Sequence, residues 1–127
     1  VWSVDEGGYD DVLIVGSTLY YSTTSAKLMA LDKGSGKVLW SKSLAGVGPG
    51  PIAFKGTIVV GEISGALKFF DARSGELISQ FEPGRGVSSR VGVDANKGEV
   101  YFMSVDAIVY ALRAQWKRYA KDWPWEI

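Results

Sequence analysis

The stretch Leu28-Met29-Ala30-Leu31-Asp32-Lys33-Gly34-Ser35-Gly36-Lys37-Val38-Leu39-Trp40 is followed later in the chain by a second version of itself. That version is Leu67-Lys68-Phe69-Phe70-Asp71-Ala72-Arg73-Ser74-Gly75-Glu76-Leu77-Ile78-Ser79, and a shorter third one is Val109-Tyr110-Ala111-Leu112-Arg113. Asp32 and Asp71 hold the same place in the first two versions. A period of about 40 residues, built from short apolar segments and glycine turns, is typical of stacked or circular β units. The repeat therefore predicts an all-β protein.

Each repeat unit divides into short apolar segments separated by turn residues, which predicts antiparallel strands. In the first unit we expect strands over residues 12–15, 18–22, 27–31 and 37–42. The second unit repeats the order over 51–54, 57–61, 66–71 and 76–81, and the third gives 87–93, 99–105 and 107–112. Four short strands in each unit of about 40 residues is the spacing of a propeller blade.

The domain organisation follows from this count. We expect a β-propeller part over residues 1–112, made of a single outer strand, two complete blades and one blade without its outer strand, at 1–5, 10–45, 50–82 and 87–112. Residues 113–127 break the pattern. There, Trp116, Tyr119, Ala120 and Trp123 have the spacing of an amphipathic helix that Pro124 would end. A short C-terminal helix with an aromatic stripe is therefore predicted.

The predicted strands add up to three blades, but the series begins with a separate outer strand and ends with a blade that lacks one. Three blades cannot close a ring, because propellers have about four to eight. The favoured explanation is that the chain is a piece of a longer propeller. The alternative is a homodimer, in which the strand at 1–5 completes the third blade of a second copy and two chains close a six-bladed ring.

Composition excludes several classes of function. The 127 residues carry 14 basic and 14 acidic side chains, a balance that argues against a nucleic-acid partner. No apolar run is long enough for a membrane-spanning helix. The absence of His removes the commonest general base and zinc ligand, and the absence of Cys excludes disulfides. We therefore expect no enzyme activity and no catalytic residue.

Two kinds of motif resemble ligand sites but are better explained as turns. Gly34-Ser35-Gly36-Lys37 resembles a phosphate loop, but Val38 stands where such a loop needs Ser or Thr. The acidic clusters at 5–11 and 94–99 could suggest calcium, yet the second has no closing bidentate Glu. We expect solvated turns at all three places, and neither a metal nor a cofactor.

The C-terminal tail is the one segment with a candidate interaction motif. Aromatic and basic side chains alternate there, and the residues singled out are Trp116, Arg118, Tyr119, Trp123 and Trp125. Such a helix can lie in a membrane interface. The favoured interpretation is that the aromatic stripe packs on the propeller itself, and a peripheral membrane or partner contact is the alternative.

The repeat also resembles a known family. Ala30-Leu31-Asp32, Gly36 and Trp40 are similar to the signature of pyrroloquinoline-quinone (PQQ)-type propeller repeats. The resemblance implies that the Trp of one blade docks on the glycine turn of the next, with its indole N–H on a backbone carbonyl. Trp2 has the docking position one blade earlier, and Asp71 and Gly75 repeat the turn. Ser79 stands where a third Trp would be, which predicts a weaker contact there.

Within these repeats, residues 1–112 resemble the C-terminal three blades of the BamB family of outer-membrane assembly propellers. The matching stretches include residues 51–61, 75–80 and 108–112. The resemblance implies a non-catalytic scaffold in the periplasm, associated with the outer membrane, with a protein partner from the assembly machinery. The alternatives are a fragment of a PQQ-dependent dehydrogenase and a sensor-type ligand-binding propeller.

Overall fold

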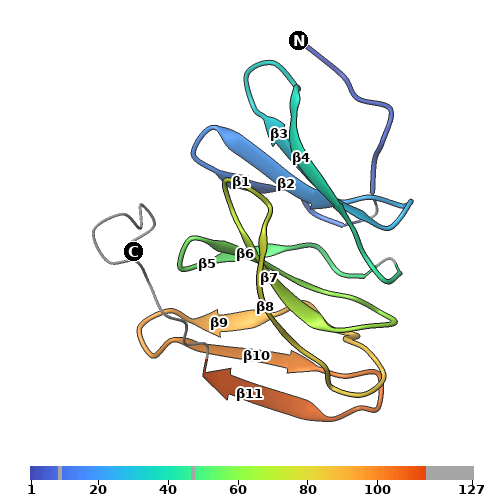
Figure 1. Cartoon of the computed structure of the whole chain (residues 1–127), viewed down its shortest axis with the longest axis vertical. Coiled ribbons are helices and arrows are strands. Elements are labelled where there is room, and N and C mark those ends of the chain that lie inside the picture. Colours follow the sequence, from blue (N-terminus) through green and yellow to red (C-terminus); the bar gives the residue numbers. More distant parts are fainter. Residues whose placement is uncertain (9, 47, 114–127) are drawn as a thin grey trace.

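A computed structural model describes residues 1–8, 10–46 and 48–113 of the chain, and these form three antiparallel sheets stacked along the long axis of the molecule (Figure 1). Blade 1 contains β1 (Leu13–Val15), β2 (Thr18–Ser22), β3 (Lys27–Asp32) and β4 (Val38–Ser43). Blade 2 contains β5 (Ile52–Phe54), β6 (Thr57–Gly61), β7 (Leu67–Asp71) and β8 (Leu77–Phe81). Blade 3 contains β9 (Gly92–Asp94), β10 (Glu99–Met103) and β11 (Val109–Arg113).

The all-β class and the three sheets are confirmed. Neighbouring strands in the sequence pair in order, so each sheet is a meander, and blade 3 has three strands where the other two have four. Among the described residues there is no helix that could cross a membrane.

Two expectations concern the ends of the chain. Residues 1–5 are expected to be the outer strand of a preceding or partner blade; within this chain no described strand pairs with them, so that assignment stays a prediction. The helix expected over 113–127 finds no support: Arg113 still belongs to β11, and residues 114–127 lie outside the described part of the chain.

Blade 3 also departs from its predicted strand lengths. The strand expected over 87–93 is reduced to β9 at 92–94, with Val87 in an isolated bridge to Ser104. At the start of the last predicted strand, Ala107 adopts a φ of 66°, which belongs to a turn, so β11 begins only at Val109.

The turn between the third and fourth strands has the same construction in blades 1 and 2. Asp32 Oδ2 accepts hydrogen bonds from the N–H and the hydroxyl of Ser35, at 2.9 and 2.8 Å. The Gly36 N–H donates to the Asp32 carbonyl at 2.8 Å, and Gly36 has a φ of 77°. In blade 2 the Gly75 N–H donates to the Asp71 carbonyl at 2.8 Å, with a φ of 76°. These left-handed conformations explain the glycine at both positions.

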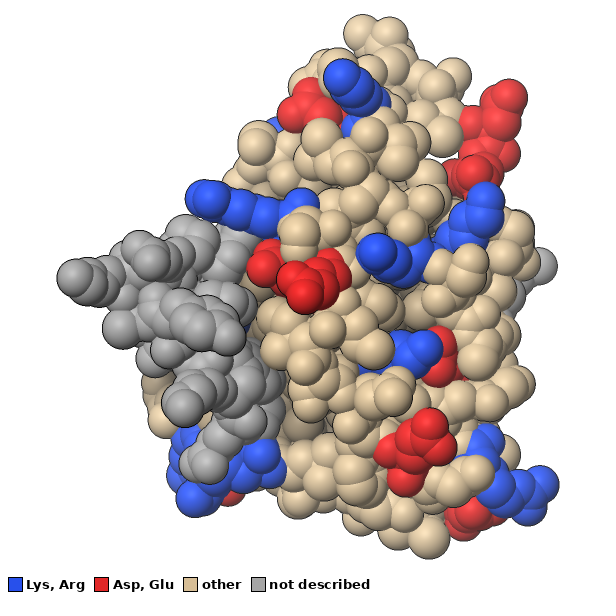
Figure 2. Space-filling model, viewed as in Figure 1, with Lys and Arg blue, Asp and Glu red and all other residues tan. Residues whose placement is uncertain are grey.

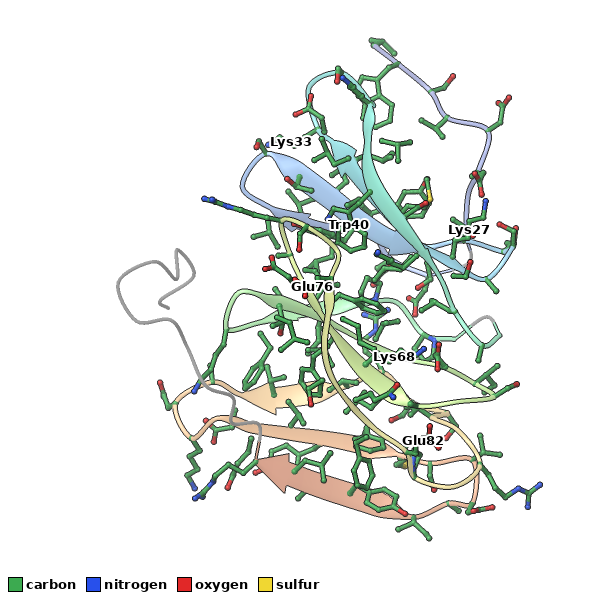
Figure 3. The ribbon with its side chains drawn as sticks, viewed as in Figure 1. Lys27, Lys33, Trp40, Lys68, Glu76 and Glu82 are labelled. Carbon is green, nitrogen blue, oxygen red and sulfur yellow. The ribbon has the colours of Figure 1, made fainter. Side chains whose placement is uncertain are left out.

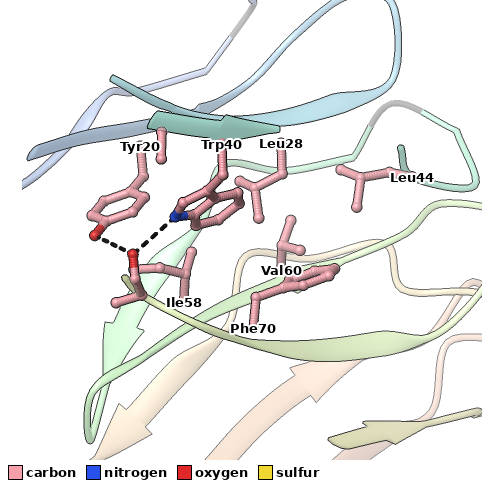
Figure 4. Close-up of a cluster of buried hydrophobic side chains, with 9 residues drawn as sticks. Tyr20, Leu28, Trp40, Leu44, Ile58, Val60 and Phe70 are labelled. Atoms are coloured by element: carbon pink, nitrogen blue, oxygen red, sulfur yellow. Dashed lines mark hydrogen bonds between the residues drawn. The ribbon is translucent and has the colours of Figure 1, made fainter. Parts of the chain in front are cut away.

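The core lies between the sheets. One cluster joins blades 1 and 2 and includes Tyr20, Leu28, Trp40, Ile58 and Phe70 (Figure 4). A second cluster joins blades 2 and 3 through residues of β6, β7 and β10. Alternate side chains of the central strands face opposite sides, so blade 2 is covered on both faces.

Candidate interaction site

The contact between blades 1 and 2 is organised around Trp40. Its indole N–H donates to the carbonyl of Ala72 at 3.0 Å, and the hydroxyl of Tyr20 donates to the same oxygen at 2.8 Å (Figure 4). The indole lies so close over Gly75 that a Cβ there would come within 2.6 Å of the ring. Ala30 is the direct strand partner of Trp40 and is fully buried in the same cluster.

Trp2 makes the equivalent contact one repeat earlier. Its indole N–H donates to the carbonyl of Lys33 at 3.0 Å, and a Cβ on Gly36 would meet the ring at 2.4 Å. Lys33 and Ala72 both directly follow the Asp of the repeated turn. Each tryptophan therefore packs on the turn of the blade that follows it.

Ser79 lies exposed on β8, and a different contact joins blades 2 and 3. The ring of Phe81 packs against Phe102 and Tyr110 with centroid distances of 6.1 and 5.3 Å. Phe102 and Tyr110 stack at 5.2 Å. Three aromatic rings therefore fill part of this interface.

Glu62 is a buried carboxylate between the blades that the sequence analysis did not single out. It is 2% exposed and follows β6 directly. Its carboxylate accepts hydrogen bonds from the N–H groups of Ala45 and Ala66, at 2.8 and 3.0 Å, and pairs with the Lys68 ammonium at 2.9 Å. Its carbonyl accepts the N–H of Val87 at 2.9 Å. Glu62 thus joins the chain that leaves blade 1, the turn in blade 2 and the chain that enters blade 3.

The sequence contained one signal for this position. Thr23 and Ser104 occupy the same turn in blades 1 and 3, and the side-chain oxygen of each accepts the N–H of the residue four positions later. The Glu62 carboxylate likewise accepts the N–H of Ala66, four positions later, and it also accepts the N–H of Ala45 and pairs with Lys68. When the three turns are aligned, Thr23, Glu62 and Ser104 share one position, which is polar in every blade and charged only in blade 2.

Glycines allow the three segments around Glu62 to approach each other. A Cβ at Gly86 would lie 2.1 Å from the carbonyl oxygen of Ile63, and one at Gly48 would lie 2.4 Å from that of Gly61. A Cβ at Gly65 would lie 2.3 Å from the Glu62 carboxylate. Side chains at these places would force backbone segments apart, so we call this set of contacts the Glu62 junction.

The acidic cluster near the start of the chain is bound to other parts of the protein. Asp10 accepts the N–H of Gly50 at 2.7 Å and pairs with Arg90, and Arg90 also contacts Asp11 at 3.2 Å. The N–H groups of Gly50 and Asp11, and after them the Arg90 guanidinium, lower the pKa of Asp10. The cluster therefore ties together the segments that precede the first strand of each blade.

The other candidate sites lie in turns or outside the described residues. Residues 33–37 connect β3 and β4, and residues 95–98 connect β9 and β10. No group of three or more metal-ligating side chains occurs in the part of the chain that the structure describes. The tail residues Trp116, Arg118, Tyr119, Trp123 and Trp125 lie beyond that part.

The surface of the described residues offers strand edges rather than a charged patch. Lys and Arg alternate with Asp and Glu on the face shown in Figure 2. β4 and β8 are the outer strands of their sheets, and each carries exposed apolar side chains, Val38 and Leu39 on β4 and Leu77 on β8. Such edges can pair with another extended chain.

Comparison with known proteins identifies the family. A family model described as outer membrane protein assembly factor BamB, of the PQQ-type repeat, matches residues 1–115. The chain belongs to this family. BamB of Escherichia coli K12 is 25% identical over 114 residues, which cover 88% of this chain and 29% of that protein. The chain thus spans less than a third of the length of this BamB relative.

Two further comparisons show how widely the repeat occurs. The crystal structure of BamB from Moraxella catarrhalis superposes with a TM-score of 0.70 at 21% identity, covering 80% of this chain and 32% of that one. The quinoprotein alcohol dehydrogenase PedH of Pseudomonas putida is 29% identical over 79 residues, which cover 53% of this chain and 13% of PedH. BamB and quinoprotein dehydrogenases therefore share the blade architecture seen here.

Proposed function

We propose that this chain is part of a non-catalytic propeller scaffold that binds proteins during the assembly of outer-membrane β-barrel proteins in the periplasm. The observation that carries the proposal is the BamB family match, which extends over residues 1–115. The fold itself serves many unrelated functions, so the family match carries more weight than the architecture.

The strand edges supply a physical means of binding. Strands of a membrane barrel alternate apolar and polar side chains before they are assembled. An extended segment of this kind can add to the free edge of a sheet, where main-chain hydrogen bonds give affinity. On β4, the exposed Val38 and Leu39 side chains are consecutive and lie on different faces, so one of them would contact the apolar residues of the added strand.

A peptide-binding measurement tests this proposal. A fluorescent peptide with the alternating sequence of a membrane-barrel strand should bind the full chain, detected by fluorescence anisotropy. Replacing both Val38 and Leu39 by lysine should weaken binding about tenfold, because the apolar contact is lost on whichever face the added strand is apolar. Val105→Lys, an exposed position in the last turn of blade 3, is the matched control and should bind as the wild type does. Equal binding by the double variant would exclude the β4 edge.

The similarity to PedH favours a quinoprotein as the second candidate. Binding the quinone and its metal ion requires converging carboxylates, and the described residues do not fit this need. Asp10 and Asp11, the acidic pair that lies beside β1, are already held by Arg90 and Gly50.

A titration distinguishes this second candidate from the scaffold. Adding pyrroloquinoline quinone with calcium to the full chain should leave the absorption spectrum of the quinone unchanged. A saturable spectral shift at micromolar protein would instead support a quinoprotein and contradict the non-catalytic assignment.

A further inference from the structure

A cavity of about 350 Å³ lies between blades 1 and 2, on the side of the molecule where β1 turns into β2. Blade 1 lines it with residues 15–18, Tyr20 and Leu39, and blade 2 lines it with Ala72 and Arg73. Both walls therefore belong to described blades of this chain, and no further blade is needed to form the cavity. Its volume is near the lower end of the range for ligand pockets, about 300–1,000 Å³.

An irregularity in β4 brings Leu39 into this cavity. Trp40 pairs with Ala30 and Val38 pairs with Leu31, so Leu39 is the extra residue between two ladder pairs. A β-bulge of this kind re-aims a side chain. In a regular strand Leu39 would face away from blade 2, because its neighbour Trp40 faces toward it. The bulge instead turns Leu39 to the blade 2 side, where it lines the cavity.

Leu39 belongs to the free edge of blade 1 as well as to the cavity. It is 50% exposed and is the second residue of β4, the outer strand of its sheet. A residue that lies beside Leu39 in an added strand would therefore stand near one end of that strand. Adjacent strands lie about 4.8 Å apart, so a long side chain on the blade 2 face would reach the cavity.

The lining of the cavity indicates the kind of side chain that fits. Val15 and Leu39 contribute apolar surface, Ser17 and Thr18 carry hydroxyl groups, and Arg73 carries a guanidinium. An aromatic ring is apolar, and its face attracts a guanidinium. The hydroxyl of a tyrosine can in addition bond to the polar groups of the lining. The chemistry of the cavity therefore favours an aromatic side chain, and tyrosine in particular.

We propose that this cavity holds an aromatic side chain at the end of the strand that adds to β4. The inference rests on the proposed function and gives the β4 edge its selectivity. Strands of membrane barrels carry aromatic residues at both ends of their apolar band. Main-chain hydrogen bonds along β4 supply affinity, and the cavity beside Leu39 distinguishes an aromatic strand end from others.

Two fluorescent peptides test the cavity on the full chain. Both have the alternating sequence of a membrane-barrel strand, and one carries tyrosine at both ends where the other carries alanine. The tyrosine peptide should bind the wild type about tenfold more tightly, measured by fluorescence anisotropy, because alanine cannot bury a ring. Ser17→Trp, which fills the cavity from the turn between β1 and β2, should abolish this preference. Asn96→Trp, exposed in the corresponding turn of blade 3, is the matched control and should keep it.

The outcomes separate this inference from the proposed function. If neither peptide binds the wild type, the proposed function fails and the inference falls with it. If both bind equally, the β4 edge still holds a strand and the cavity assignment is wrong. A tyrosine preference that persists in Ser17→Trp would also overturn it. The alanine peptide should bind Ser17→Trp as it binds the wild type, which shows that the variant is folded.

A small probe tests the cavity without a peptide. p-Cresol, which reproduces the side chain of tyrosine, should shift the methyl NMR signals of Val15 and Leu39 saturably in the wild type. The same signals should stay unshifted in Ser17→Trp, because the added indole occupies the cavity. Unshifted signals in the wild type would contradict the aromatic assignment, even where the peptides bind.

Discussion

Replacing Trp40 with serine is expected to lower the free energy of unfolding by about 3–5 kcal/mol. The side chain is 9% exposed, and its ring lies 5.9 Å from that of Tyr20 and 6.4 Å from that of Phe70. The substitution removes the largest side chain of the contact between blades 1 and 2, together with its hydrogen bond to Ala72. Urea unfolding followed by far-ultraviolet circular dichroism measures the loss.

Two further substitutions separate the contributions of this side chain. Trp40→Phe keeps most of the buried area and loses the indole N–H, so it should cost much less than the serine variant. Trp2→Ser is the matched control, since Trp2 makes the same hydrogen bond from a partly exposed position. If Trp2→Ser were as costly as Trp40→Ser, burial between two blades would not explain the effect.

Glu62→Gln is expected to cost about 3 kcal/mol at pH 7. Two backbone N–H groups and the Lys68 ammonium all donate to the carboxylate. A glutamine has one acceptor oxygen, so its amide N–H₂ would face another donor, and a buried donor would lose its partner. Glu82→Gln, an exposed position at the end of β8, should change stability by less than about 0.5 kcal/mol (Figure 3 labels Lys68 and Glu82).

The cost of Glu62→Gln should also depend on pH. Burial raises the pKa of Glu62, but the hydrogen bonds from Ala66, Lys68 and Ala45 outweigh burial, and the pKa in the folded protein is lowered. A carboxyl with a lowered pKa stabilises the fold fully above its unfolded pKa of about 4.3, and this contribution is lost as the pH falls through the folded value. The difference between wild type and variant should therefore be largest at pH 7 and shrink below about pH 4. A difference that stays constant down to pH 3 would contradict the role given to the charge.

Most of the fold could be predicted because the repeat supplied each element twice. The strands of blades 1 and 2 lie within one residue of their expected limits, since Gly36 and Gly75 mark the turns and the apolar runs between them are short. The strand expected at residues 1–5 stays a prediction, because it has no partner among the described strands. Its composition matches that of β4, but a strand forms only beside another strand.

The Glu62 junction could not be predicted from one copy of the repeat. A single Glu between Gly61 and Ile63 has the composition of a solvated turn. Its burial depends on backbone segments from two other blades, which approach because Gly48 and Gly86 lack side chains. Contacts between segments that are distant along the chain, such as those of Glu62 with Ala45 and Val87, leave little trace in local composition.

The Glu62 junction has a practical consequence for where foreign sequence can be inserted. The segments at 45–46, at Gly48, at 61–65 and at 86–87 meet backbone to backbone, so even one added residue would separate the blades. The turn from Ala95 to Lys97, between β9 and β10, is exposed along its whole length. Loop tips of this kind tolerate insertions. An epitope or a fluorescent reporter placed in that turn would leave the assembly of the three blades intact.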